Sequence, residues 1–371
     1  MRPRPRGRWP AAPAIGPSVG PTGVWDDDGV TPPASADLPP HWSARAPSSQ
    51  DVAALTALVA HHHLVTRGST SVDEAAVALE VTGYASWTRR QLLVTDPQGA
   101  VRGWCRVHDR AAGRTVVDLT VDPGHPDADQ VAAHLFAWAQ EMALVIAGQR
   151  GLPGTQLDSG RHVDDESQAR WLAAAGYTRV RTWLQMTRPV MADEGAPGAL
   201  PGPREGVTVR RVATHDTGLP VAGDLQTVHQ MLEESFADHF NSYRESFPEF
   251  VQRLREDPGH RWDHWWVAEV ESDGATLPGG AIVSSVLSAD ATGTEGSYVD
   301  YIGVHRRARG RGVAKALLHT VIRDAAQRGR NRVNLEVDAD SPTGADGLYV
   351  SMGWHTAHRT ESWHRDVQLP H

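Results

Sequence analysis

The chain contains 371 residues, of which 40% are hydrophobic and 22% are charged. Its 36 basic and 45 acidic side chains leave a formal net charge of −9, which disfavours nucleic acid and anionic membranes as partners. Cys105 is the single cysteine, so an internal disulfide and a cysteine-based zinc site are both excluded. No apolar run reaches the roughly 20 residues of a membrane helix, and the basic start lacks the apolar core of a signal peptide. We therefore expect a cytoplasmic protein.

The length favours two domains, because one domain typically holds about 100–200 residues. Residues 1–45 are rich in Pro, Gly, Ala and Asp without apolar periodicity, so we expect a disordered tail. Residues 191–206 form a second Pro- and Gly-rich stretch, which is typical of an interdomain linker. The remaining segments, 46–190 and 207–369, are similar in size and are therefore examined for an internal repeat.

The C-terminal segment alternates between strand-like and helix-like patterns. An apolar stripe at helical spacing runs from Gly312 to Gly329, which predicts a helix with a glycine stop. The other predicted elements, in chain order, are the edge strand 207–210, the helix 224–237, the strands 265–268, 280–283, 298–304 and 333–337, and the short helix 345–352. This order predicts an α+β fold, in which a mixed, mostly antiparallel central sheet contains one parallel crossover and is flanked by helices.

A strongly basic segment, HRRARGRGVA, occupies residues 305–314 between a predicted strand and the following helix. Four arginines fall within six positions, in a chain that is acidic overall. Gly310 and Gly312 allow the backbone to approach a ligand closely, and the free amides at a helix N-terminus attract anions. The segment therefore predicts a pyrophosphate cradle. The alternative is a solvated, arginine-rich turn.

Two motifs resemble those of the GNAT N-acetyltransferase superfamily. Arg309-x-x-Gly312-x-Ala314 matches its acetyl-CoA signature, Q/R-x-x-G-x-G/A, in the required strand–loop–helix setting. The segment SPTGADGLYVSMGW, from Ser341 to Trp354, resembles the second motif, N-x-x-A-x-x-L-Y-x-x-x-G-F. Ser341 replaces the usual Asn, and Trp354 replaces Phe.

The resemblance covers roughly residues 207–368 and implies that acetyl-CoA is the co-substrate. In similar enzymes, the strand before the cradle pairs with the pantetheine arm, and the cradle holds the pyrophosphate. The residues implied in binding acetyl-CoA are Ile302, Gly303, Val304, Arg309, Gly310, Arg311, Gly312, Val313, Ala314 and Ser341. The implied reaction is direct attack of a primary amine on the acetyl thioester within a ternary complex.

The leaving thiolate of such a reaction needs a proton. Tyr349 falls on the tyrosine that donates this proton in the superfamily, so the resemblance implies that it is the general acid. The alternative is a helix tyrosine packed between the sheet and the co-substrate.

The attacking amine must be neutral, which calls for a general base. Asp300 lies two residues before Ile302 on the same strand, so we expect both side chains to leave the same face of the sheet, near the amine. An ordinary hydrogen-bonding role is the alternative for Asp300. Glu336 on the neighbouring strand is the rival base, with Tyr298 and Asp338 behind it.

By family analogy, the acceptor cleft is expected near the end of the helix 224–237. Glu234, Asp238 and His239 are the candidate lining residues, and a solvated helix end is the alternative. The run at residues 61–63 is three consecutive histidines, but no further ligand follows at a useful spacing, so we expect no metal site.

The N-terminal segment repeats the pattern without the chemistry. Residues 117–122 align with residues 299–304 at a constant offset of 182. With the same offset, Asp127 and Asp129 stand where the cradle has arginines, and they would repel a pyrophosphate. Leu172 takes the place of the tyrosine. We therefore expect a degenerate GNAT-like domain, retained for packing or for closing the acceptor site.

The sequence as a whole predicts two tandem GNAT domains with one working site, a plan that resembles tandem members of the superfamily. The expected activity is acetyl-CoA-dependent N-acetylation of a small-molecule amine by a monomer or homodimer. The alternatives are a non-catalytic acyl-CoA-binding sensor and a peptide or protein N-acetyltransferase.

Overall fold

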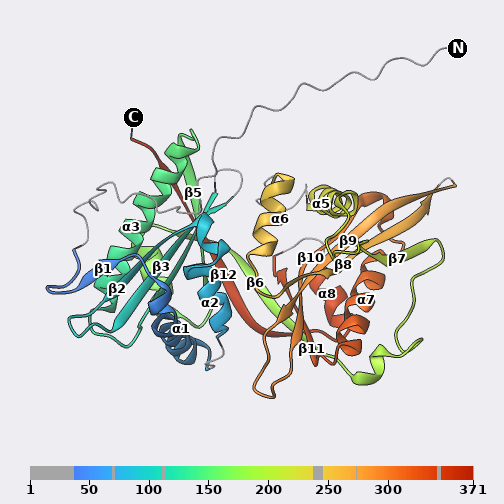
Figure 1. The fold of residues 1–371 in the computed structure, drawn as a ribbon, viewed down its shortest axis with the longest axis horizontal. Coiled ribbons are helices and arrows are strands. Elements are labelled where there is room, and N and C mark those ends of the chain that lie inside the picture. The colour runs from blue at the N-terminus through green and yellow to red at the C-terminus, as the bar shows by residue number, and fades with distance from the viewer. Residues whose placement is uncertain are drawn as a thin grey trace, which may run out of the picture. The chain divides into compact units, whose positions relative to one another are not determined.

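The computed structural model describes residues 37–68, 72–110, 114–236, 245–272, 274–340 and 344–370. The N-terminal half contains β1 (Ser43–Arg45), α1 (Val52–Arg67), α2 (Glu74–Val81), β2 (Arg89–Thr95), β3 (Val101–Arg110), β4 (Arg114–Val121), α3 (Ala128–Gln149), β5 (Gly154–His162), α4 (Glu166–Ala174) and β6 (Thr178–Pro189). The C-terminal half contains β7 (Val207–Arg211), α5 (Ala222–Phe236), α6 (Phe247–Arg255), β8 (His260–Ser272), β9 (Ala275–Leu287), β10 (Gly296–Val304), α7 (Val313–Gln327), β11 (Arg332–Asp338), α8 (Ala345–Ser351) and β12 (His355–Gln368). Figure 1 shows these elements.

All the described strands belong to one sheet, in the order β1-β2-β3-β4-β5-β12-β6-β11-β10-β9-β8-β7. Neighbouring strands are antiparallel except for two pairs, β4 with β5 and β10 with β11. The helices α3 and α7 connect these two parallel pairs. The expected α+β fold is therefore confirmed, with one parallel crossover in each half.

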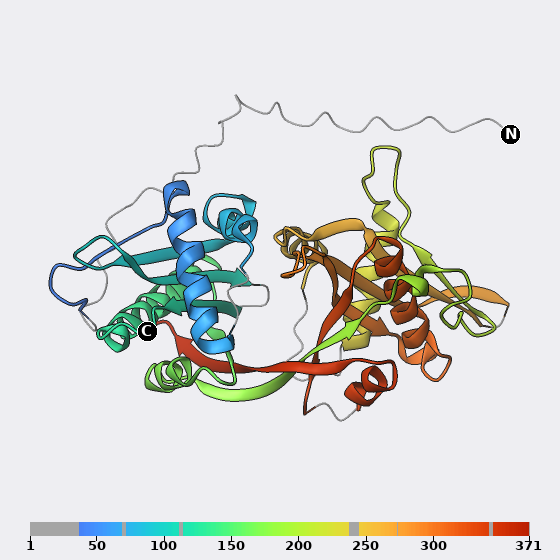
Figure 2. The same cartoon turned by 90° about the horizontal axis from the view of Figure 1, so that it is seen from below.

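The last strand of each half pairs with strands of the other half. β6 lies antiparallel to β11, from the pair Arg332–Pro189 to the pair Asp338–Trp183. β12 lies between β5 and β6 and pairs with both, and Figure 2 shows β6 and β12 running side by side. The two halves are thus joined by exchanged strands into one continuous sheet, which repeat analysis of the sequence did not predict.

The parallel pair in the C-terminal half separates after a short contact. β10 pairs with β11 only where residues 297–299 face residues 333–335, so a wedge opens between the two strands beyond Val299. In the pairing of β10 with β9, the register changes between Val299 and Tyr301, which leaves Asp300 as an extra residue in a β-bulge. The wedge and the bulge lie directly before the predicted cradle.

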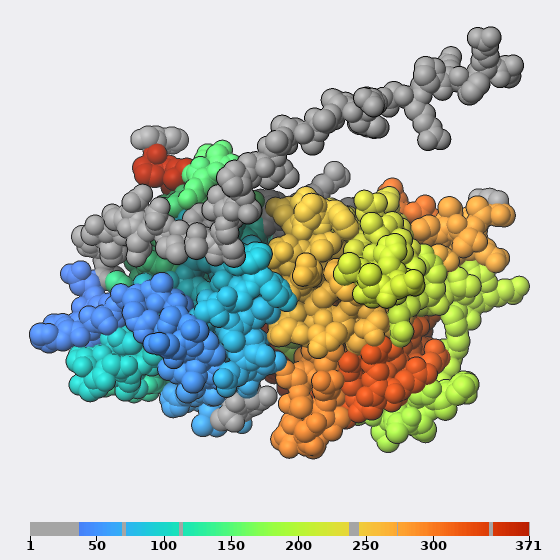
Figure 3. Space-filling view, in the orientation of Figure 1, coloured from blue at the N-terminus to red at the C-terminus, as the bar shows by residue number. Residues whose placement is uncertain are grey.

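Helices cover both faces of this part of the sheet. On one face, α5 and α6 pack against β8 and β9 through a cluster that includes Val228, Phe250 and Trp265. Figure 3 shows the surfaces of α5, in yellow-green, and α6, in gold. The acceptor cleft was expected at the end of α5.

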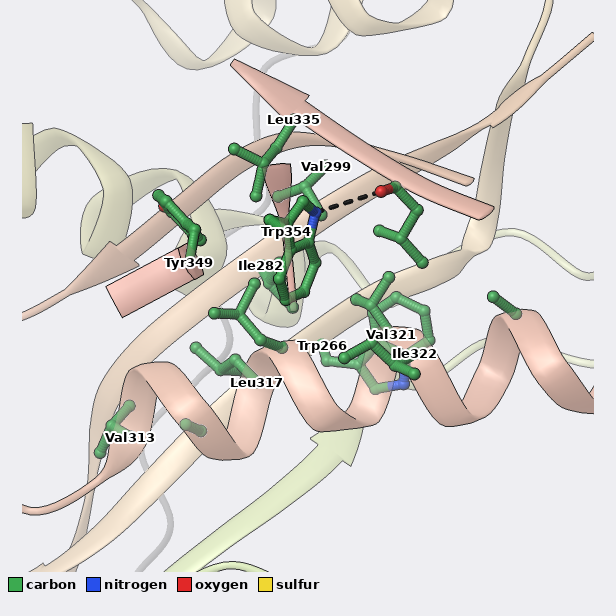
Figure 4. Packing of buried hydrophobic residues seen from close by; sticks show 14 of the residues in the cluster. Trp266, Ile282, Val299, Val313, Leu317, Val321, Ile322, Leu335, Tyr349 and Trp354 are labelled. Carbon is green, nitrogen blue, oxygen red and sulfur yellow. Dashed lines mark hydrogen bonds between the residues drawn. The ribbon is translucent and has the colours of Figure 1, made fainter. Parts of the chain in front are cut away.

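On the other face lies α7, which confirms the helix predicted between two glycines. Its stripe of Val313, Leu317 and Val321 is buried in the C-terminal core, where each such side chain contributes about 1.5–3 kcal/mol to the free energy of unfolding. Figure 4 shows this stripe facing Ile282 and the other buried side chains of the sheet. After α7 ends, Gly329 adopts a φ of 72°, the left-handed conformation that favours glycine as a helix stop.

The predicted linker, residues 191–206, is packed along α7. Leu200 lies against the C-terminal core, and Gln327 of α7 donates a hydrogen bond to the Gly195 carbonyl at 3.1 Å. Arg188 of β6 also donates to Glu194. The segment therefore connects the halves along a defined path.

The expected tail, residues 1–45, overlaps the folded part at its end. Residues 1–36 lie outside the described residues, but Leu38 and Trp42 pack against the N-terminal core, and β1 pairs with β2. Residues 37–45 therefore belong to the N-terminal half, a correction to the expected boundary. Within the same half, α3 is long and apolar enough by length and composition to cross a membrane, and Leu135 and Ala139 on it are fully buried in the core.

Candidate active site

The cradle is a short loop whose backbone is fixed at both ends. His305 N–H donates to the Gly279 carbonyl at 3.0 Å, and Ala308 N–H donates to the His305 carbonyl at 2.8 Å. Gly310 and Gly312 adopt φ values of 77° and 83°, where a side chain would be strained. The loop thereby turns directly into α7, and within the described ranges the N–H groups of its first turn have no backbone acceptor.

The cations predicted at the cradle are not neutralised by neighbouring carboxylates. In the described part of the chain, none of them forms an ion pair, in contrast to arginines such as Arg188 and Arg253. The cations concerned are Arg306, Arg307, Arg309, Arg311 and Lys315. A net-acidic chain thus presents a local excess of positive charge at the positive end of a helix dipole, as a pyrophosphate site requires.

Arg204 of the linker adds a sixth cation that the sequence analysis missed. Its Nη1 donates to the Gly310 carbonyl at 3.3 Å, and a Cβ at Gly312 would lie only 3.0 Å from its Cδ. Its guanidinium therefore lies over the turn into α7. No sequence signal could have placed it there, because Arg204 precedes the motif by a whole domain.

The residues expected to bind pantetheine line the wedge between β10 and β11. Ile302 and Val304 pack toward the core beneath α7, whereas Gly303 faces α5, where a Cβ would lie 3.0 Å from the Ser235 Cβ. Alternate amides of an antiparallel strand point to either side, and β10 lacks a strand partner on its β11 side beyond Val299. These amides are available to an extended, amide-bearing ligand.

Tyr349 lies on α8 beside the wedge and is 8% exposed. Figure 4 shows its ring near Leu335 and Trp354, and its ring centre is 6.0 Å from that of Trp354. Burial raises the pKa of Tyr349 to about 12, so the phenol retains its proton at neutral pH. The side chain is able to donate a proton to a leaving thiolate, and its role as the acid stays a prediction.

Asp300 does not share a face with Ile302, and this expectation is corrected. Ser285 Oγ donates to Asp300 Oδ1 at 3.2 Å, and Ser285 pairs with Tyr298 on the face opposite Val299. The bulge at Asp300 breaks the alternation on which the expectation depended. Asp300 therefore lies on the face covered by α5 and α6, while Ile302 packs toward α7.

The environment of Asp300 suits a proton acceptor. Burial, reinforced by the charge of Asp257, raises the pKa of Asp300 to about 8, while the hydrogen bond from Ser285 and the charge of Arg253 oppose the rise. A carboxylate with such a pKa is close to the range in which general bases work efficiently.

The rival base, Glu336, lies on the same face as Asp300. It follows Asn334 by two positions on β11, and Asn334 pairs with Tyr298. Gln185 of the exchanged strand β6 donates a hydrogen bond to it. Burial first, and then the charges of Glu336 and Asp300, raise the pKa of Tyr298, so the structure brings all three groups together. Behind them, Asp338 accepts a hydrogen bond from the Asp340 N–H at 2.9 Å, which stabilises the turn after β11.

The remaining candidates have separate outcomes. Glu234 Oε2 lies 2.8 Å from His305 Nε2, so it joins α5 to the cradle. Asp238, His239 and Ser341 lie outside the described residues. In the histidine run, His62 Nε2 contacts Asp165 Oδ2 at 3.0 Å.

The equivalent loop of the N-terminal half is occupied by the chain itself. Asp129 accepts a hydrogen bond from Trp171 Nε1 at 2.6 Å. Gln130 donates to the Asp37 carbonyl at 2.7 Å, and the ring of Trp42 contacts His125 edge-on. These contacts cover the start of α3, the position that corresponds to the cradle.

Residues 227–354, which contain the cradle, the wedge and Tyr349, match the Acetyltransferase (GNAT) family. The C-terminal half is a GNAT acetyltransferase domain. A mycothiol acetyltransferase of Frankia casuarinae is 30% identical over 220 residues, which cover 57% of this chain and 59% of that protein. The matched region thus spans less than two thirds of this relative.

Two solved structures share the fold of the GNAT domain and of its companion half. A GCN5-related N-acetyltransferase from Sphaerobacter thermophilus has a TM-score of 0.66 at 24% identity, covering 90% of this chain and 98% of its own. A tandem GNAT protein from the clavulanic acid biosynthesis pathway has a TM-score of 0.63 at 14% identity, covering 89% and 100%. The predicted tandem GNAT fold is confirmed.

Proposed function

We propose that the protein is an acetyl-CoA-dependent N-acetyltransferase whose working site lies in the C-terminal half and whose acceptor is the primary amine of a small molecule. The observation that carries the proposal is the adjacency of three features: unpaired cations at the cradle, a wedge with free strand amides, and acidic side chains on the face opposite α7. The degenerate N-terminal domain supplies no second site in this proposal.

In the proposed reaction, the cradle binds the pyrophosphate and the wedge binds the pantetheine arm. A free amide of residues 302–304 donates a hydrogen bond to the thioester oxygen, where negative charge develops. Asp300, or Glu336 through a water, takes the proton of the attacking amine. The C–N bond forms, the C–S bond breaks, and Tyr349 gives its proton to the departing sulfur.

Three classes of acceptor amine are considered, in decreasing order of support. A mycothiol-type amine comes first, because the Frankia casuarinae relative carries the name mycothiol acetyltransferase. Metabolite or antibiotic amines come second. The N-terminal amines of peptides come third. The arrangement of the fold does not choose among them, because function resides in the site.

The test is an acceptor screen in which thiol release from acetyl-CoA is followed and the acetylated product is identified by mass. The panel contains the cysteinyl mycothiol precursor, aminoglycosides, other metabolite amines and short peptides. Amine-dependent thiol release supports the proposal. Tight acetyl-CoA binding without release by any amine would indicate the non-catalytic sensor instead.

A further inference from the structure

A buried carboxylate that the proposed mechanism does not use joins the two halves. Glu256 directly follows α6, and its side chain is 4% exposed. It accepts hydrogen bonds from Arg89 Nη1 at 2.7 Å and from Thr88 Oγ1 at 2.8 Å. His108 Nε2 lies 3.3 Å away. All three partners belong to the N-terminal half, so one end of α6 is held by residues outside the GNAT domain.

The charge of this pair is balanced by Arg89 alone. Burial and the charge of Arg89 lower the pKa of His108 to about 2, so the imidazole is neutral. Arg89 Nη1 also donates to the Ala85 carbonyl at 2.6 Å, which fixes its orientation. A buried carboxylate with these donors has one preferred position, because removing a donor would leave a buried charge unpaired.

The same helix holds the strand on which the reaction is proposed to occur. Arg253, three residues before Glu256 on α6, donates to the Tyr301 hydroxyl at 2.7 Å. It also donates to Glu245 at 2.8 and 2.6 Å. Tyr301 follows Asp300 directly at the bulge, so the position of α6 decides where the guanidinium of Arg253 lies relative to Asp300.

α6 depends on such tertiary contacts because it is short. It contains nine residues, and an isolated helix of this length is marginal in water. Its N-terminus is stabilised by the capping box of Ser246 and Glu249, but Glu256 is the group that ties its C-terminus to the rest of the molecule. Figure 3 shows the gold surface of α6 adjoining the cyan surface of the N-terminal half.

We propose that the N-terminal half serves the reaction as a positioning element, in which Arg89 and Thr88 hold Glu256 and thereby keep Arg253 of α6 against Tyr301 and Asp300. The inference rests on the proposed function. Arg89 and Glu256 touch no reacting atom in this scheme, so they are positioning residues. The degenerate half thus acts on the acceptor face, away from the cradle.

The test compares Arg89→Gln and Thr88→Val with Arg89→Lys, which keeps a cation opposite Glu256. Arg45→Gln is the matched control, because Arg45 forms a similarly short pair with Asp51 within the N-terminal half. For Arg89→Gln we expect kcat with the amine to fall about 10- to 100-fold, as for a misplaced reacting group. We expect a smaller loss for Thr88→Val, while acetyl-CoA affinity stays within about twofold, and Arg89→Lys recovers most of the rate.

Hydrogen exchange of the α6 amides gives a readout that does not depend on activity. We expect faster exchange over residues 247–255 in Arg89→Gln, in a protein that stays folded by circular dichroism, and wild-type exchange in Arg45→Gln. Wild-type amine kinetics in folded Arg89→Gln and Thr88→Val would overturn the inference, and so would an equal loss of acetyl-CoA binding and rate. If no amine is acetylated by the wild type, the proposed function fails, and the exchange data alone decide whether Arg89 positions α6.

Discussion

Replacing Asp300 by asparagine is expected to have opposite effects on catalysis and on stability. Because the pKa of Asp300 is raised to about 8, the wild-type side chain is largely protonated at about pH 6 and largely ionised at about pH 9. A general base must be ionised to act, so kcat/KM should rise with pH through about 8. Asp300→Asn should lower kcat by about 10²- to 10⁴-fold and remove this limb of the pH profile.

The same pKa shift sets the sign of the effect on folding. An unperturbed aspartate titrates near 3.8, so between about pH 4 and pH 8 the unfolded chain is ionised while the folded chain holds the proton. Folding is therefore penalised progressively as pH rises across this window, by about 1.4 kcal/mol per unit. The rise from 3.8 to about 8 gives an upper bound of about 6 kcal/mol at and above pH 8. Asparagine escapes this penalty, so the variant should equal the wild type near pH 4 and exceed its free energy of unfolding near pH 8.

Both effects are measurable on the same preparations. Urea unfolding at about pH 4, 6 and 8 gives the free energies, and initial rates at saturating acetyl-CoA give the pH profile. Ser285→Ala is the companion variant, because the hydrogen bond from Ser285 lowers the pKa of Asp300, and its loss should move the limb to higher pH. A wild-type pH limb in Asp300→Asn would refute the assignment of Asp300 as the base, and Glu336→Gln would then test the rival.

Three further predictions concern co-substrate binding and proton donation. Arg309→Glu with Arg311→Glu should abolish acetyl-CoA binding in calorimetry, because two of the unpaired cations at the cradle become anions; unchanged affinity would exclude the cradle. Arg204→Glu should weaken acetyl-CoA binding by about tenfold and flatten its salt dependence, whereas wild-type titration curves would show that Arg204 does not contact the ligand. Tyr349→Phe should lower kcat far more than KM, since the proton matters only as the thiolate leaves; wild-type turnover would remove Tyr349 from the mechanism.

The local parts of the fold and site could be predicted from the sequence because their determinants are adjacent in it. The apolar stripe of α7, bounded by Gly312 and Gly329, is written in one short segment, and so is the arginine-rich loop before it. The turn, the helix start and the charge all depend on neighbouring residues. The cradle motif therefore indicated its structural setting directly.

The errors came from features that depend on distant partners or on a shift of one residue. A single extra residue at Asp300 reversed the face of the sheet that its side chain occupies relative to Ile302, because strand side chains alternate with a period of two. The approach of Arg204 to Gly312 depends on the path of the linker along α7. The pairing of β12 with β5 joins strands that are far apart in the chain, and strand periodicity does not reveal which neighbour a strand will choose.

The exchange of β6 and β12 bears on how this duplication can evolve. A chain cut before β7 would lose the neighbour of β11 and leave β12 without β5, so it would expose open sheet edges of the kind that lead to aggregation. Substitutions that erase the chemistry of the first copy leave this pairing intact, whereas deletion of the first copy would remove it. The silent copy is thus retained by its topology, because selection can discard its chemistry but cannot discard its strands.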